Sequence, residues 1–280
     1  ENGGGHLSEA IGLVNLFVPK GPVVQLRESG GRVEVLESDQ PKVAYSGPLT
    51  ILVDRFSASA SEIFAAAMQD YGRGIVIGQE TYGKGSVQNL YPLDRFALGK
   101  DPGYGQLTVT IGMYYRVTGE STQNRGVKPD ITLPSPISPH DVGESSRESA
   151  LPWNRIRPTD FDDEVVLTPM VAELQRNHEV RTTGDPDYQY TLAEIAALDE
   201  MRSQKSVSLN LEMRKAEREQ RAKQQLEREN IRRVAQGEEA LESVSDIEES
   251  PDVLLAEAAE ITADLTLIEP RYVAKRRDES

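Results

Sequence analysis

The chain has 280 residues, no cysteine and a formal net charge of −15, and 38% of its residues are hydrophobic. This length fits one large domain or two ordinary ones, and the modest hydrophobic share indicates a compact core joined to a more solvated, charged region. The acidic balance argues against general nucleic-acid binding. The lack of cysteine excludes disulfides, zinc–thiolate sites and cysteine nucleophiles. No apolar run approaches the roughly 20 residues that a membrane-spanning helix needs.

The chain opens on a glycine-rich turn, Glu1 to Gly5, and a loop of this kind normally follows a strand. We therefore expect the chain to be part of a longer protein, in which case its lack of a signal peptide carries no information. Apolar residues at helical spacing between 7 and 18 predict a first helix. Ser8 suits its start, and Pro19 ends it.

The next elements predict an α/β core. Segments 23–27 and 32–36 flank a Ser-Gly-Gly turn and predict a β-hairpin. The apolar run 49–53 is typical of a strand buried on both faces. An alanine-rich helix over 62–71 and a second buried strand over 75–78 follow it, which together predict a βαβ unit and a parallel sheet. Further strands are expected at 86–90, 107–117 and 131–133.

The composition changes near residue 134. We expect a core domain over 1–134, a linker rich in proline, serine and charge over 135–150, and a mostly helical domain over 151–280. Helices are expected from Pro152 onward. The run 209–235 is highly charged with few large apolar residues, which favours a solvated helix or coiled-coil arm, a partner-binding helix being the alternative. The other predicted elements are helices at 191–202 and 252–268 and an acidic loop at 236–251.

Three serines, Ser57, Ser59 and Ser61, lie between the predicted strand and the alanine-rich helix. The carboxyl end of a parallel strand is where α/β proteins place their sites. The free N–H groups and the dipole of the helix N-terminus can stabilise a developing oxyanion. The simpler interpretation is N-capping, which needs only one serine.

Lys84 lies between two glycines, which allow a tight turn and a close backbone approach. It can act as a general base only when neutral, and burial can lower a lysine pKa by several units. The simpler interpretation is an exposed turn lysine. Residues 78–84 also match the first part of a nucleotide-binding loop, but Gly85 stands where that loop needs Ser or Thr. Because 86–92 is typical of a strand rather than a helix, we do not expect a nucleotide site.

The three histidines offer no convincing base. His140 lies in the predicted linker and His178 in the charged region, whereas His6 lies next to the glycine loop. An activated serine then needs another base, for which lysine is the known substitute. Paired carboxylates and metal-ligand clusters lack convincing spacing, so neither a cofactor nor a metal is predicted.

Three motifs, in this order, resemble the carboxyl-terminal processing peptidases, a PDZ-containing family of serine proteases. They are Asn-Gly-Gly-Gly at 2–5, Ser-Ala-Ser-Ala-Ser-Glu-Ile at 57–63 and Gly-Lys-Gly-Ser-Val-Gln at 83–88. The resemblance implies a mixed-sheet catalytic core of the crotonase and Clp protease type. It also implies an additional helical C-terminal domain.

The resemblance implies a role for five residues. Ser59 is the nucleophile, and Lys84, 25 residues later, is the general base. Gln88 orients this lysine, and on a strand the two would share a face. The backbone N–H groups of Ala60 and Gly5 form the oxyanion hole.

The resemblance also implies protein substrates with apolar C-terminal tails, a lipoprotein adaptor as a further partner and a periplasmic location. Two parts of the family pattern are not in this chain: the strand ending in Asp-Leu-Arg before the glycine loop, and the PDZ domain that captures the substrate's C-terminus. An inactive fragment and a non-catalytic scaffold or adaptor-binding module are therefore alternatives to a peptidase. The intact set Ser59, Lys84 and Gln88 favours the peptidase.

Overall fold

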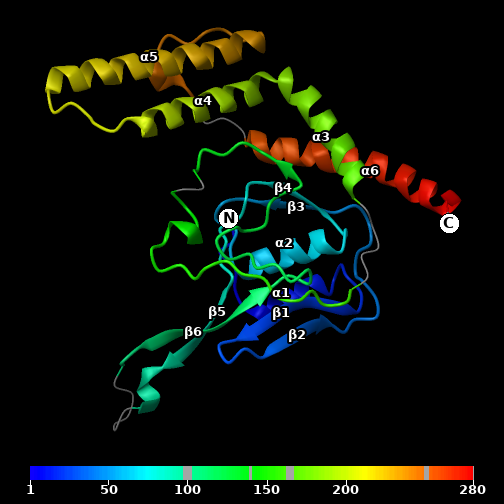
Figure 1. The fold of residues 1–280 in the computed structure, drawn as a ribbon. Coiled ribbons are helices and arrows are strands. Elements are labelled where there is room, and N and C mark those ends of the chain that lie inside the picture. The colour runs from blue at the N-terminus through cyan, green and yellow to red at the C-terminus, as the bar shows by residue number, and fades with distance from the viewer. Residues whose placement is uncertain (97–102, 139–140, 162–166, 249–251, 280) are drawn as a thin grey trace. The chain divides into compact units, whose positions relative to one another are not determined.

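The computed structural model describes residues 1–96, 103–138, 141–161, 167–248 and 252–279, with side chains described as far as residue 270. The chain forms two compact units (Figure 1). Unit 1 contains Glu1–Thr132 and Ile137–Leu167, and unit 2 contains Leu133–Pro136 and Thr168–Ser280. A mixed α/β unit followed by a helical unit is the predicted fold class, which is confirmed.

Unit 1 contains two sheets. One is antiparallel, in the order β2-β1-β6-β5, and the other is parallel, in the order β3-β4-β7. The elements are α1 (Leu7–Val14), β1 (Gly21–Glu28), β2 (Val33–Ser38), β3 (Thr50–Val53), α2 (Ala60–Asp70), β4 (Ile75–Gly78), β5 (Ser86–Pro92), the 3-10 helix η1 (Leu93–Phe96), β6 (Gln106–Tyr115), β7 (Ile131–Thr132) and the 3-10 helix η2 (Glu144–Ser146).

The predicted βαβ unit is present as β3, α2 and β4. The two strands pair in parallel from Thr50 opposite Ile75 to Val53 opposite Gly78. Every residue of β4 is buried. The expectation that the first strand is buried on both faces is wrong, because Leu52 is 48% exposed. The physical reason is that β3 lies at the edge of the three-stranded sheet, whereas β4 lies at its centre.

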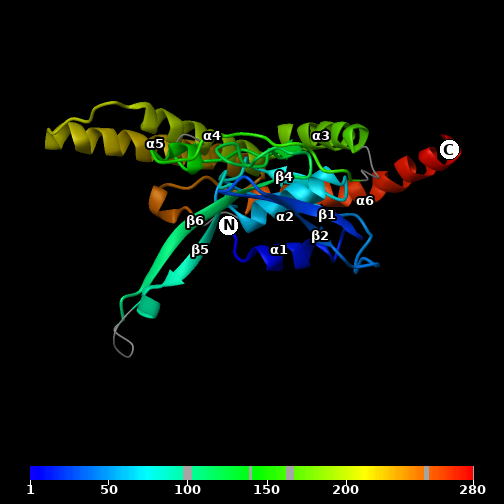
Figure 2. The ribbon, with the colours of Figure 1, turned by 60° about the horizontal axis from the view of Figure 1, so that its bottom comes forward.

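Two hairpins make up the antiparallel sheet. The predicted hairpin of β1 and β2 is confirmed. The hairpin of β5 and β6 extends from the body of unit 1 as a two-stranded arm (Figure 2). Its register shifts between Val87 and Gln88, next to the end that carries Lys84. The arm therefore begins at the residues that the sequence singles out for chemistry.

The segment 141–161 packs within unit 1 and, apart from the short 3-10 helix η2, is not helical. The expected helical character from Pro152 onward is wrong for 152–161, where the Ile156 N–H donates to the Gly119 carbonyl over 2.8 Å. The side chain of Trp153 donates to the Ser121 carbonyl over 2.8 Å. Prolines in this stretch lack the N–H that a helix interior needs, which favours this extended course. The limits of the three predicted domains stay a prediction.

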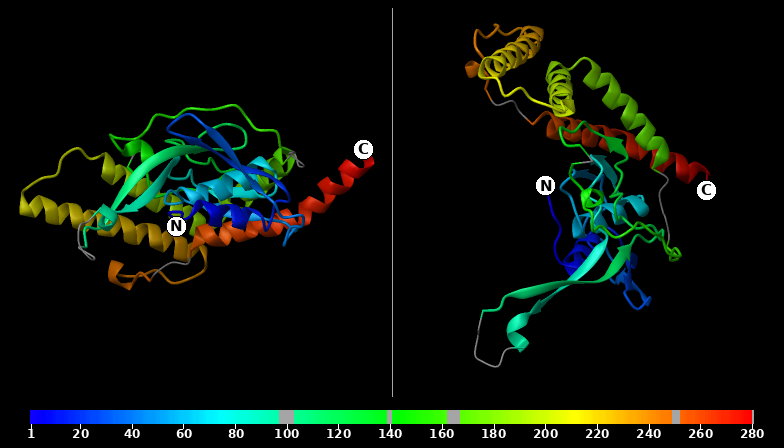
Figure 3. Two further views of the ribbon diagram at one scale, coloured as in Figure 1. Left: turned by 90° about the horizontal axis from the view of Figure 1, so that it is seen from below. Right: turned by 60° about the vertical axis from the view of Figure 1, so that its left-hand side comes forward.

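Unit 2 is helical: α3 (Thr168–Thr183), α4 (Pro186–Ser203), α5 (Leu211–Ala235), the 3-10 helix η3 (Val244–Asp246) and α6 (Val253–Glu279). The expected helices at 191–202, 209–235 and 252–268 are confirmed as parts of α4, α5 and α6. Helix α3 packs against α6, and α4 against α5 (Figure 3). In α5 only Glu229 is buried, which agrees with a solvated helix. Within the described residues, no helix is both long and apolar enough to cross a membrane.

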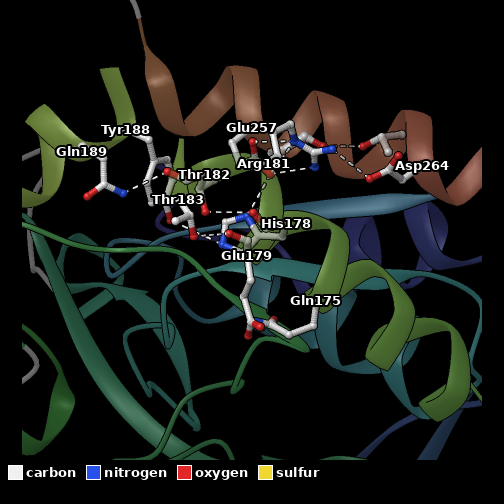
Figure 4. A network of polar contacts seen from close by, with 12 residues as sticks. Gln175, His178, Glu179, Arg181, Thr182, Thr183, Tyr188, Gln189, Glu257 and Asp264 are labelled. Carbon is white, nitrogen blue, oxygen red and sulfur yellow. Dashed lines mark hydrogen bonds and ion pairs between the residues drawn. The ribbon is translucent and has the colours of Figure 1, made fainter. Parts of the chain in front are cut away.

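A polar network joins α3 to α6 inside unit 2 (Figure 4). Glu257 of α6 lies 2.8 Å from His178 Nδ1 and 2.8 Å from Arg181 Nη2, both on α3. Arg181 Nη1 also reaches Asp264 Oδ2 over 3.0 Å. Because His178 and Glu257 are both buried, these contacts satisfy polar groups that would otherwise oppose the packing of the two helices.

Candidate active site

Ser59 lies at the turn between β3 and α2, at the N-cap position of the helix. Its φ of 58° and ψ of −117° are unusual for a residue that is not glycine. Strained backbone of this kind occurs at functional sites, where the surrounding structure holds it in place. Ser57 differs, because its hydroxyl is engaged with Asp54 Oδ1 over 3.0 Å. Of the three serines in this motif, all of them within the described residues, only Ser59 has a positive φ.

The glycine loop packs against the Ser59 turn. The Ala58 N–H donates to the Asn2 carbonyl over 3.0 Å. Gly4 has a φ of +94°, and a Cβ there would lie 2.6 Å from the Ala58 oxygen and 2.8 Å from the Ala60 nitrogen. A Cβ on Gly5 would meet nothing within 4 Å. The loop therefore packs against the turn that carries Ser59, with Gly4 making the closest approach, and the oxyanion-hole roles of Gly5 and Ala60 stay predictions.

Lys84 is half-buried, and its Nζ donates to Gln88 Oε1 over 3.2 Å. This contact joins two of the predicted residues, although Lys84 precedes β5 and a bulge intervenes. The flanking glycines have a steric role, since a Cβ on Gly85 would lie 2.9 Å from the Gln123 nitrogen. Among the described residues, no hydrogen bond joins Ser59 Oγ to Lys84 Nζ. The expected strand after Gly85 is confirmed as β5, which removes the helix that a nucleotide-binding loop requires.

Glu62 connects the two motifs. Its carboxylate is fully buried and accepts the backbone N–H groups of Ser59 at 2.7 Å and of Lys84 at 3.0 Å. It also accepts the Gly83 N–H at 2.7 Å and the Thr81 hydroxyl at 2.5 Å. Burial raises the pKa of the Glu62 carboxyl to about 7, and these hydrogen bonds oppose the rise. One side chain therefore holds the backbone of both predicted catalytic residues.

Sequence reasoning did not assign Glu62 to the site. The signal that could have found it is the pattern Ser-x-x-Glu at 59–62, which is typical of a capping box. Tyr114 was also missed. Its phenol is buried, and the phenol oxygen lies 3.1 Å from the Ser59 carbonyl oxygen and 2.6 Å from the Lys84 carbonyl oxygen. No local pattern reveals this contact, because Tyr114 reaches the site from a strand 30 residues beyond Lys84 in sequence.

The segment expected as a linker supports the Lys84 loop. The Glu144 N–H donates to the Tyr82 carbonyl over 2.9 Å. Gln123 accepts the Gly85 N–H at 2.9 Å and donates to the Leu151 carbonyl at 3.1 Å. Residues 141–151 therefore contact the Lys84 loop directly at Tyr82 and, through Gln123, at Gly85.

The three histidines of the chain lie in different parts of the sequence. His6 is exposed at the start of α1, and His178 belongs to unit 2. His140 lies outside the described residues. No group of three or more His, Asp or Glu side chains suited to a metal ion occurs in the described part of the chain.

Two family models match the chain. A family model described as peptidase family S41 matches residues 1–133. A second, described as the C-terminal domain of tail specific protease, matches residues 137–267. Over residues 1–133, the chain belongs to peptidase family S41. The resemblance that the three sequence motifs carry is therefore confirmed.

Two relatives match most of the chain and about half of it, respectively. The chain is 40% identical over 279 residues to the tail-specific protease of Haemophilus influenzae, a match that covers 95% of this chain and 39% of that protein. It is 36% identical over 137 residues to the carboxy-terminal-processing protease of Bartonella bacilliformis, covering 49% of this chain and 30% of that protein. The chain thus spans less than half the length of these relatives.

A solved structure also matches part of the chain. The photosystem II D1 C-terminal processing protease is 31% identical, and the match covers 47% of this chain and 32% of that chain with a TM-score of 0.41.

Proposed function

We propose that this chain carries the catalytic machinery of a serine endopeptidase in which Ser59 is the nucleophile and Lys84 the general base. The observation that carries this proposal is the Glu62 carboxylate, which binds the backbone N–H groups of both Ser59 and Lys84. A scaffold without catalysis has no need for a strained serine and a lysine whose backbones are joined by one buried carboxylate, with a glutamine bound to the lysine amine.

The proposed reaction is acyl transfer. Ser59 Oγ attacks the scissile carbonyl carbon while neutral Lys84 Nζ takes the hydroxyl proton. Gln88 Oε1, which accepts a hydrogen bond from Nζ, orients the lysine. The N–H groups of Ala60 and Gly5 stabilise the oxyanion. Lys84 then gives its proton to the leaving amine, and water hydrolyses the ester on Ser59 to release the acid and restore the hydroxyl.

The proposed substrates are proteins recognised by an apolar C-terminal tail. The names of the relatives, tail-specific protease and carboxy-terminal-processing protease, support this class of substrate. We further propose a periplasmic location and a lipoprotein adaptor as a partner. For both, the resemblance to bacterial tail-specific proteases is the support.

Substitution of the serine tests the proposal. In the longest natural form of the protein, Ser59→Ala is expected to abolish cleavage of a denatured protein and covalent labelling by a fluorophosphonate. Ser57→Ala is the matched control, since that hydroxyl binds Asp54 within the same turn, and it should still be labelled. Cleavage at the wild-type rate by Ser59→Ala would contradict the proposal.

A further inference from the structure

Tyr114 of β6 places one buried phenol between the two predicted catalytic residues. Its oxygen lies 2.6 Å from the Lys84 carbonyl oxygen, 3.1 Å from the Ser59 carbonyl oxygen and 2.9 Å from Thr122 Oγ1. Carbonyl oxygens can only accept, so the phenol proton points to them and the Thr122 hydroxyl donates to the phenol oxygen. Burial raises the pKa of the Tyr114 phenol well above its usual value, which keeps that proton in place.

The hydrogen bond from Tyr114 to the Ser59 carbonyl also restrains the N–H group of the same peptide. The Ser59 C=O and the Ala60 N–H belong to one planar trans peptide, in which they point in opposite directions. The Ser59 carbonyl also accepts the Glu62 N–H over 2.9 Å and the Ile63 N–H over 3.1 Å in the first turn of α2, so the phenol is a third restraint on this peptide. It thereby helps to set the direction of the Ala60 N–H, which is the proposed oxyanion donor. The need for such support is greater here, because Ser59 has a φ of 58°.

The contact with Lys84 completes a set of backbone restraints. The Lys84 N–H is held by Glu62 at 3.0 Å, and its carbonyl is held by Tyr114. The next N–H, that of Gly85, is held by Gln123 at 2.9 Å. With the backbone fixed on both sides, the direction of the Lys84 Cα–Cβ bond is fixed as well, and the side chain continues to Gln88.

We propose that Tyr114 is a positioning residue of the peptidase reaction, whose single hydroxyl sets the Ser59–Ala60 peptide and the Lys84–Gly85 peptide relative to each other. The proposal rests on the proposed function of Ser59 and Lys84. It assigns Tyr114 no contact with substrate, so it predicts an effect on the chemical step and none on substrate binding.

The test is Tyr114→Phe in the longest natural form of the protein, with peptide hydrolysis measured under steady-state conditions. We expect kcat to fall about 10- to 100-fold, the range that follows from misplacing reacting groups by a fraction of an ångström to one ångström. KM should stay within about twofold, because uniform substrate binding is untouched. Acylation of Ser59 by an activated ester, followed in a single turnover, should slow by the same factor as kcat.

Tyr115→Phe is the matched control. Tyr115 is the next residue of β6, is equally buried, and its phenol donates one hydrogen bond, to Asn154 Oδ1 over 2.6 Å. Both variants lose a buried phenol hydrogen bond, so both should unfold at a lower temperature. Only Tyr114→Phe should lose kcat. Wild-type kcat in Tyr114→Phe, or an equal loss of kcat in Tyr115→Phe, would overturn the proposal.

Thr122→Val decides the question if Tyr114→Phe does not fold. This variant keeps the phenol and the shape of the buried side chain, but removes the hydroxyl that directs the phenol proton to the two carbonyls. A lower kcat with unchanged KM would support the proposal, and an unchanged kcat would overturn it. A wild-type rate for Ser59→Ala would instead contradict the proposed function itself, so the two failures are distinguishable.

Discussion

Lys84 Nζ donates a hydrogen bond to Gln88 Oε1 over 3.2 Å. The contact spans the start of β5, where the register shifts between Val87 and Gln88. An amide oxygen can orient an amine without adding a charge beside it. A carboxylate in the same place would hold the lysine in its charged form. The choice of glutamine is therefore consistent with a lysine that must lose its proton in order to act.

The first prediction concerns this choice. Gln88→Glu should move the lower limb of the pH–activity profile upward by about one pH unit, because an opposite charge beside Lys84 stabilises its protonated form. Peptide hydrolysis across a pH series measures the shift. Asn89→Asp adds the same charge one residue further along β5 and should leave the profile in place. An unshifted profile in Gln88→Glu would argue against Lys84 as the base.

A second prediction tests Lys84 directly. Lys84→Arg should abolish hydrolysis and fluorophosphonate labelling, because a guanidinium stays protonated and cannot accept the Ser59 proton. The control is Lys42→Arg, which makes the same change at an exposed lysine of unit 1 and should keep full activity. Activity in Lys84→Arg within tenfold of the wild type would contradict the proposed base.

The third prediction follows from the buried Glu62 carboxyl. Its pKa in the folded protein is raised to about 7 from 4.5, so between these values the folded state binds more protons than the unfolded state. The stability that this group contributes is therefore fully present below about pH 4.5 and is lost as the pH rises through 7. Urea unfolding between pH 4.5 and 8 should show this decline in the wild type and a flatter dependence in Glu62→Gln.

Glu37→Gln provides the matched control for that experiment. Glu37 is exposed on β2, so its replacement removes the same charge without removing a buried carboxyl. This variant should follow the wild-type pH dependence. A Glu62→Gln profile parallel to both would show that Glu62 does not titrate in this range.

A fourth prediction concerns the helical unit. Arg181→Ala leaves the buried Glu257 carboxylate without its guanidinium partner, which should lower the free energy of unfolding by about 3 kcal/mol. Arg214→Ala breaks an exposed pair with Glu217 and should change it by less than about 1 kcal/mol. Chemical denaturation followed by circular dichroism distinguishes the two. Equal losses would mean that burial of Glu257 does not govern this contact.

Part of this architecture could be predicted because it is local. Strand β4 follows from four consecutive apolar residues, and the serine and lysine motifs have fixed neighbours in sequence. Strand β3 reads the same way, but its Leu52 is exposed because the strand is at a sheet edge. Edge position depends on which strands pair, and a run of apolar residues does not encode it.

The supports of the site escaped prediction for a related reason. Glu62 is visible as a capping residue, but its hydrogen bonds to Gly83 and Lys84 come from a loop more than 20 residues away. From the sequence, Tyr114 is one more aromatic residue of a buried strand, and only the structure shows that its hydroxyl binds the Ser59 and Lys84 carbonyls. Residues such as these act through tertiary contacts, whereas the predicted nucleophile and base are recognised by the glycines and alanines next to them in sequence.

The fastening of residues 141–151 to the Lys84 loop has a practical consequence for dissecting this protein. A truncation at residue 134, where the composition changes, would leave the Tyr82 carbonyl and the Gln123 amide without the groups they bind. A piece meant to retain the reaction would have to run to at least residue 161. We likewise expect a protease cut within 141–151 to weaken the support of the Lys84 loop without removing Ser59 or Lys84.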